Sequence, residues 1–122
     1  MRGILLDEHL TDAIANALHR HDPSIRIRRI GDGIAPPFGS EDPDLLVWIE
    51  SVDFVLITNN RGSMPIHLGA HMAAGRHVPG IIQVPKQFRI SDLAEELALI
   101  LGASMPGELV DRITYIRIPQ KP

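Results

Sequence analysis

The sequence has no cysteine among its 122 residues. Neither a disulfide framework nor a zinc site with thiolate ligands can therefore form. Long apolar runs are also missing, since the longest, such as residues 4–6 and 97–101, fall far short of the roughly 20 residues of a membrane span. The first residues lead directly into a strand-like run and lack the architecture of a signal peptide. We expect a cytoplasmic protein without a membrane segment.

A strong basic charge is missing as well. The formal net charge is -3 and the isoelectric point is about 6.0, whereas proteins that bind nucleic acid usually present a basic face to the phosphates. Arg26, Arg28 and Arg29 do cluster in one strand-like segment, a pattern more typical of a solvent-exposed edge. The charge balance weighs against a nuclease but does not exclude one.

The composition, 44% hydrophobic and 22% charged, is typical of a folded domain. We find no repeat and no low-complexity segment. Residues 31–41 are rich in glycine and proline and predict a long loop. Too few residues precede this loop for a separate fold, so residues 1–122 are expected to form a single domain.

Apolar periodicity predicts strands that alternate with helices. Strands are expected at residues 3–6, 25–30, 54–57, 79–84 and 113–118. Helices are expected at residues 11–20, from residue 43 onward with Leu45, Leu46 and Ile49 buried, at residues 64–74 and at residues 91–101. Thr11, Ser40 or Asp42, and Ser91 are the expected N-caps, and Gly75 and Gly102 are expected to end the last two helices.

Strands that are apolar throughout and alternate with helices indicate an α/β fold. We predict a doubly wound, mostly parallel sheet flanked by helices, in three α/β/α layers. In such sheets ligands bind beyond the carboxyl ends of the strands.

Three polar clusters follow strands or begin helices, at residues 7–9 (DEH), 41–44 (EDPD) and 58–61 (TNNR). Parallel strands would bring the first and third to one edge of the sheet, where carboxylate oxygens suit a hard divalent cation. Such ions promote phosphodiester hydrolysis. Each cluster also has a purely structural interpretation: Asp42 as an N-cap, Asp44 as a first-turn acid that favours the helix dipole, and Asp7 and Glu8 as solvated loop residues.

Residues 4–10 (ILLDEHL), 39–48 (GSEDPDLLVW) and 55–67 (VLITNNRGSMPIH), in this order and spacing, resemble a family of small PIN-like proteins. Residues 75–84 are similar to that family too, so the resemblance covers roughly residues 3–85. The family includes toxin components and domains of unknown function. The resemblance implies the doubly wound PIN-like fold and a metal-dependent ribonuclease, often paired with an antitoxin protein.

By position, the resemblance assigns Asp7 and Asp42 as catalytic metal ligands for Mg²⁺ or Mn²⁺. Asn60 stands where the family usually has aspartate, and its amide oxygen brings no negative charge to the ion. Glu8 and Asp44 are candidate compensating ligands. Thr58 and Arg61 are candidate substrate-binding residues, with Arg61 on a phosphate of the RNA.

Other functions remain open. The loss of a carboxylate at Asn60 and the acidic pI favour a non-catalytic PIN-like binding module. A receiver-like phospho-acceptor domain would need an aspartate directly after residues 55–57, and the sequence has none there. His67 and His71 are four residues apart and could share a transition metal, but this spacing is more typical of surface histidines. No glycine-rich phosphate loop and no serine nucleophile with an obvious partner is evident.

The predicted helix at residues 91–101 is unusually apolar. Leu93, Leu97, Ile100 and Leu101 form one stripe, and neighbouring alanines and Leu99 widen it beyond what one sheet face needs. We therefore expect the helix to bury most of its surface and the chain to form a homodimer.

Overall fold

Strands and helices alternate in the computed structural model, which describes residues 2–60, 62–105 and 107–118. The strands are β1 (Gly3–Leu6), β2 (Ile27–Arg29), β3 (Phe54–Thr58), β4 (Ile81–Gln83) and β5 (Ile113–Tyr115). The helices are α1 (Asp12–His21), α2 (Asp42–Val52), α3 (Met64–Ala73) and α4 (Ile90–Ala103).

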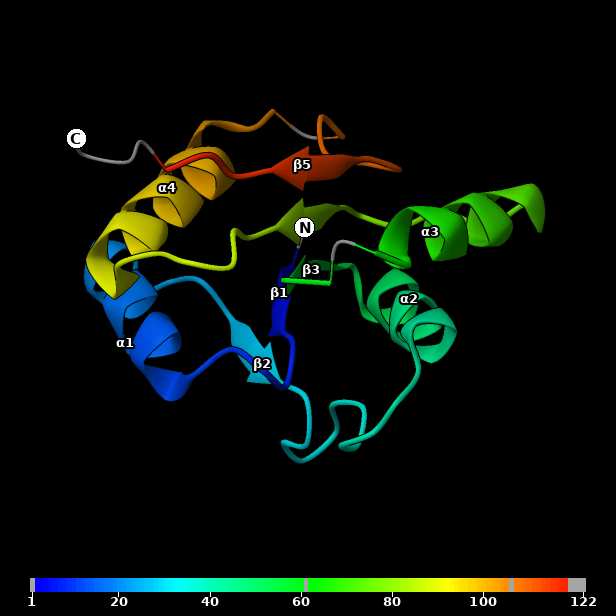
Figure 1. Ribbon diagram of the computed structural model, residues 1–122, viewed down its shortest axis with the longest axis horizontal. Coiled ribbons are helices and arrows are strands. Elements are labelled where there is room, and N and C mark those ends of the chain that lie inside the picture. Colours follow the sequence, from blue (N-terminus) through cyan, green and yellow to red (C-terminus); the bar gives the residue numbers. More distant parts are fainter. Residues whose placement is uncertain (1, 61, 106, 119–122) are drawn as a thin grey trace.

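The strands form one parallel sheet in the order β2-β1-β3-β4-β5. The chain winds outward from β1 to β2, returns to β3 on the other side of β1, and continues to β4 and β5. Helices α1 and α4 cover one face, and α2 and α3 cover the other (Figure 1). The predicted doubly wound α/β fold with three layers is confirmed, and its topological switch point lies between β1 and β3.

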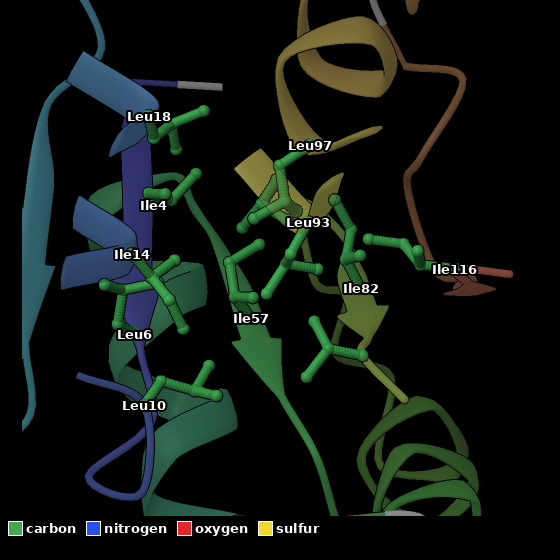
Figure 2. Close-up of a cluster of buried hydrophobic side chains, with 12 residues drawn as sticks. Ile4, Leu6, Leu10, Ile14, Leu18, Ile57, Ile82, Leu93, Leu97 and Ile116 are labelled. Atoms are coloured by element: carbon green, nitrogen blue, oxygen red, sulfur yellow. The ribbon is translucent and has the colours of Figure 1, made fainter. Parts of the chain in front are cut away.

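The face under α1 and α4 carries the first of two hydrophobic cores. Alternate strand residues such as Ile4, Leu6 and Ile57 point to this face and meet Leu18 and Leu93 of the helices (Figure 2). Helices α1 and α4 also pack against each other. The central strands β1 and β3 are buried along their whole length because the residues between these point into the opposite core.

The second core lies between the sheet and helices α2 and α3. Its fully buried members include Leu5, Leu45, Leu46, Leu56 and Ile49. The buried face predicted for α2 is thereby confirmed. At its rim the rings of Trp48 and Phe54 meet edge to face, with centroids 5.5 Å apart.

The start of α2 differs from the prediction in a way that matters for the site. Asp42 is the first residue of the helix, and Glu41 is its N-cap, without a capping side-chain hydrogen bond. Neither Ser40 nor Asp42 is therefore the N-cap. Pro43 is tolerated because the first turn has no intrahelical partner for its N–H. Thr11 is the N-cap residue of α1, as expected, but its side chain makes no capping hydrogen bond.

Helix α4 extends beyond both predicted ends. It begins at Ile90, so Ser91 lies inside the first turn and is not the N-cap. It also continues through Gly102, where an end was expected. The Ser104 hydroxyl donates to the carbonyl oxygen of Ile100, which supplies a partner at the C-terminus without a glycine cap.

Three strands are shorter than predicted. β2 omits Ile25 and Ile30, although the Ile30 N–H still donates to the carbonyl of Leu6. β4 lies between Pro79 and Pro85, which have no N–H for a ladder. β5 ends at Tyr115, and residues 119–122 lie outside the described part of the chain.

Helix α4 buries one face rather than most of its surface. Leu93, Ala94 and Leu97 are buried, Ile100 and Leu101 pack partly against the same core, and Leu99 is 57% exposed. Of the residues that were expected to widen the stripe toward a second chain, Ala94 and Ala98 pack in the core of the same chain and Leu99 is exposed, and the homodimer stays a prediction. No helix in the described ranges is both long and apolar enough to cross a membrane.

Candidate functional site

Asp7 and Thr58 lie side by side at the carboxyl ends of β1 and β3. Leu6 pairs with Ile57, and Asp7 and Thr58 are the next residue after each. Because side chains alternate between the two faces of a sheet, those of Asp7 and Thr58 point toward α2 and α3. The Thr58 hydroxyl donates to Oδ2 of Asp7 at 2.7 Å, and the N–H of Glu8 donates to Oδ1 at 2.7 Å. Both residues are buried. The Asp7 carboxylate is thus held firmly at the switch point of the sheet.

Asp42 faces the same region from the first turn of α2. Its Oδ2 accepts hydrogen bonds from Nδ2 of Asn60 at 2.6 Å and from the Ser63 hydroxyl at 3.2 Å. A carboxylate can only accept, so the nitrogen end of the Asn60 amide must face it. Asn60 Nδ2 also lies 3.0 Å from the Ser63 hydroxyl oxygen. Asp42 was interpreted as a helix cap, but its side chain reaches across to the loop after β3.

Thr58 and Asn60 connect the two carboxylates. The Thr58 hydroxyl that donates to Asp7 also accepts the N–H of Asn60 at 3.1 Å, and the Asn60 side chain donates to Asp42. A continuous path of hydrogen bonds therefore runs from Asp7 to Asp42, although 35 positions separate them in the sequence (42 − 7). The spatial convergence of Asp7, Asp42 and Asn60 at this edge of the sheet agrees with the prediction.

His67 is a neighbour of this cluster that the sequence did not point to. Its Nε2 lies 3.7 Å from Oδ2 of Asp42, and its side chain is about one-third exposed. His67 follows Ser63 by one helical turn, so both side chains lie on one face of α3. Ser63 follows Asn60 by three residues, and His67 follows Ser63 by four. This spacing was the only feature of the sequence that could have placed His67 near Asn60. His71 lies at the other end of α3, so the two histidines do not share a site.

The remaining predicted site residues are not part of this network. Asp44 is exposed in the first turn of α2, and Glu8 contributes its backbone N–H to Asp7. Neither carboxylate reaches the path from Asp7 to Asp42. Arg61 lies outside the described residues, so its expected contact with a phosphate stays a prediction. Thr58 donates to Asp7, and its expected contact with substrate stays a prediction.

This edge of the sheet offers two candidate carboxylate ligands and no closed metal centre among the described residues. In the described part of the chain, no three His, Cys, Asp or Glu side chains are placed to hold one ion. Asp7 and Asp42 offer two carboxylates, and Mg²⁺ is commonly bound by one or two carboxylates together with waters and substrate phosphates. Asn60 could add its amide oxygen only by giving up the hydrogen bond to Asp42.

A second polar cluster lies at the amino ends of the strands, far from this site. The Glu50 carboxylate accepts a hydrogen bond from Arg76 Nε at 3.0 Å, and Nε2 of His71 lies 2.9 Å from its Oε1. The hydrogen bond from Arg76 is the main cause that holds the pKa of Glu50 below its ordinary value. Burial raises the pKa of Asp111, but donors including the Val78 N–H and the His77 ring outweigh it and hold the pKa low. These pairs join α2, α3 and the segment before β5.

No family model, no curated protein and no solved structure matches the chain. The fold is therefore established by the strand order and the helix layers alone. Because proteins of many functions share such folds, the function has to be argued from the residues at the sheet edge.

Proposed function

We propose that this chain is a PIN-like domain that hydrolyses RNA with the help of Mg²⁺ or Mn²⁺ at Asp7 and Asp42. The observation that supports the proposal is the hydrogen-bonded path that joins these two carboxylates across Thr58 and Asn60. It lies at the switch point between β1 and β3, where ligands of doubly wound folds bind.

In this proposal Asp7 and Asp42 would hold the ion. When bound, such an ion lowers the pKa of a water and offsets the charge of a phosphate. Thr58 keeps the Asp7 carboxylate in one orientation, so no side-chain entropy is lost when a cation is bound. Asn60 weakens the site because it adds no negative charge. Arg61, expected from the sequence to contact a phosphate, would add positive charge beside it.

The resemblance to PIN-like toxins adds a biological role to the proposal. The chain would be the toxin of a toxin–antitoxin pair, and an antitoxin protein would be its partner. The proposed role predicts growth arrest when the chain is expressed alone. Growth arrest that persists in Asp7→Asn would separate toxicity from the proposed site.

RNA cleavage tests the proposed activity. A labelled single-stranded RNA is incubated with the protein in Mn²⁺ or in EDTA, and the products are resolved by electrophoresis. We expect cleavage in Mn²⁺ only, and a loss of about a hundredfold or more in Asp42→Asn because one of two ligand charges is removed. Glu95→Gln, an exposed acid of α4 on the opposite face of the sheet, is the control with the same charge change. Equal cleavage by both variants would contradict the proposal.

A second candidate function is favoured by one observation. Asn60 and Ser63 both donate to Oδ2 of Asp42, so this carboxylate has partners without a metal ion. A non-catalytic PIN-like binding module would keep the fold and this network but would not bind a cation. Calorimetric titration with Mn²⁺ separates the two candidates: binding that requires Asp7 and Asp42 supports the nuclease, and no binding at millimolar Mn²⁺ supports the module.

A further inference from the structure

The long loop between β2 and α2, residues 31–41, projects from one end of the sheet beside the candidate site (Figure 1). It is compact, because the Gly31 N–H donates to Pro36 at 2.7 Å and the Ala35 N–H donates to Asp32 at 2.7 Å. Its last residue precedes Asp42, the first residue of α2. The loop therefore forms a structured wall that leads directly to a proposed catalytic carboxylate.

Two large apolar side chains of this loop face solvent. Ile34 is 78% exposed and Phe38 is 70% exposed. One side of the Phe38 ring packs on Gly31, so closely that a Cβ there would lie 2.5 Å from ring atoms. Gly31 also has φ +94°, which favours glycine. An aromatic ring that packs on the backbone on one side and stays largely exposed is suited to stack against a flat ligand.

The residues that directly follow Gly31, on which this ring packs, line a hollow together with a basic side chain. Arg28 of the edge strand β2 is exposed and has no ion-pair partner among the described residues. Together with Asp32, Gly33 and Ile34 it lines a hollow of about 380 Å³. Asp32 accepts the backbone N–H of Arg29 at 3.3 Å, so the hollow holds one acidic and one basic side chain, and the guanidinium of Arg28 is the group that can contact a phosphate.

We propose that Arg28 and Phe38 form a binding surface for single-stranded RNA that feeds the candidate site. An exposed aromatic ring with a neighbouring guanidinium is the combination that binds single strands, through base stacking and phosphate contact. The loop that carries Phe38 leads directly to Asp42. An RNA strand bound here would therefore extend toward Asp7 and Asp42. The inference rests on the proposed function and names where its substrate binds.

Equilibrium binding in EDTA tests this surface without cleavage. A fluorescent single-stranded RNA of about 12 nucleotides is titrated with the full chain, and anisotropy gives the dissociation constant. We expect Phe38→Ala to weaken binding about tenfold and Phe38→Trp to retain it, because stacking needs a ring. Arg28→Ala should weaken binding and reduce the slope of log affinity against log salt by about 0.7.

Met105→Ala is the matched control, because Met105 is 72% exposed and follows α4 on the other face of the sheet. Its RNA affinity should equal that of the wild type, and all variants should melt within about 3 °C of it. Wild-type affinity in both Phe38→Ala and Arg28→Ala would overturn the inference, as would absence of RNA binding by the wild type. A dimer that Phe38→Ala converts to monomer, with RNA affinity unchanged, would overturn it in favour of a protein contact.

The inference and the proposed function can fail separately. A wild type that binds RNA through Phe38 but does not cleave it in Mn²⁺ supports this surface and contradicts the nuclease. A wild type that cleaves RNA while Phe38→Ala and Arg28→Ala bind normally contradicts this surface alone.

Discussion

The side-chain nitrogen of Asn60 lies 2.6 Å from Oδ2 of Asp42. An aspartate at position 60 would place a second carboxylate against that of Asp42. Two carboxylates at this distance would need a shared proton or a cation between them. The amide removes that need in the metal-free protein. Asn60 thereby stabilises the folded chain, and under the proposed function it would also weaken the attraction of the site for an ion.

Replacement of Asn60 by aspartate should reverse both effects. Asn60→Asp adds a charge beside the ion, and after desolvation and repulsion from Asp7 and Asp42 we expect Mn²⁺ affinity to rise by about 1–3 kcal/mol, or roughly tenfold to a hundredfold. Without metal, the lost donor and the new repulsion should lower the free energy of unfolding by about 1–3 kcal/mol. Calorimetric titration and urea denaturation measure the two quantities.

Asn59→Asp is the control for this substitution, because it places the same charge one residue away on a half-buried side chain. It should raise Mn²⁺ affinity much less than Asn60→Asp. Equal effects of the two variants would show that Asn60 acts through general charge and is not a ligand.

The hydroxyl of Thr58 should matter more than its methyl group. Thr58→Val keeps the shape but leaves Oδ2 of the buried Asp7 without its donor at 2.7 Å, which costs about 1–3 kcal/mol of unfolding free energy. Thr58→Ser keeps the hydroxyl and loses one methyl group, for about 1 kcal/mol. Urea denaturation should rank wild type above Thr58→Ser and Thr58→Ser above Thr58→Val. The reverse order of the two variants would show that Thr58 acts through packing alone.

Glu50 should contribute to stability in a pH-dependent way. Chiefly because of the hydrogen bond from Arg76, its pKa lies below the ordinary 4.5. A carboxyl with a lowered pKa in the folded state stabilises the protein above its ordinary pKa, and the stabilisation is lost as pH falls through the lowered value. The difference in unfolding free energy between wild type and Glu50→Gln should therefore be full at neutral pH and shrink below pH 4.5. A difference that stays constant into acid would contradict this.

The sequence predicted the layers and the sheet edge because these follow from local periodicity and from a general rule of parallel sheets. Asp7 directly follows β1 and Thr58 ends β3, so the proximity of the two residues could be predicted without knowing the conformation of any loop. The approach of Asn60 to Asp42 was expected, but the hydrogen bond to Asp42 from Ser63 was not, since an acid before Pro43 is equally consistent with a helix cap. His67 was missed because its contact depends on how α3 lies against α2. The ends of α4 also depend on tertiary contacts rather than on the preferred capping residues.

RNA cleavage by Asp7→Asn, measured beside the wild type in Mn²⁺, tests the central claim most directly. Asp7 is buried at the switch point and accepts hydrogen bonds from Thr58 and from the N–H of Glu8. The asparagine has nearly the same volume but lacks the charge, so a fold check by denaturation accompanies the assay. The account predicts wild-type cleavage that falls about a hundredfold or more in the variant. Cleavage that Asp7→Asn leaves intact would contradict the assignment of this site.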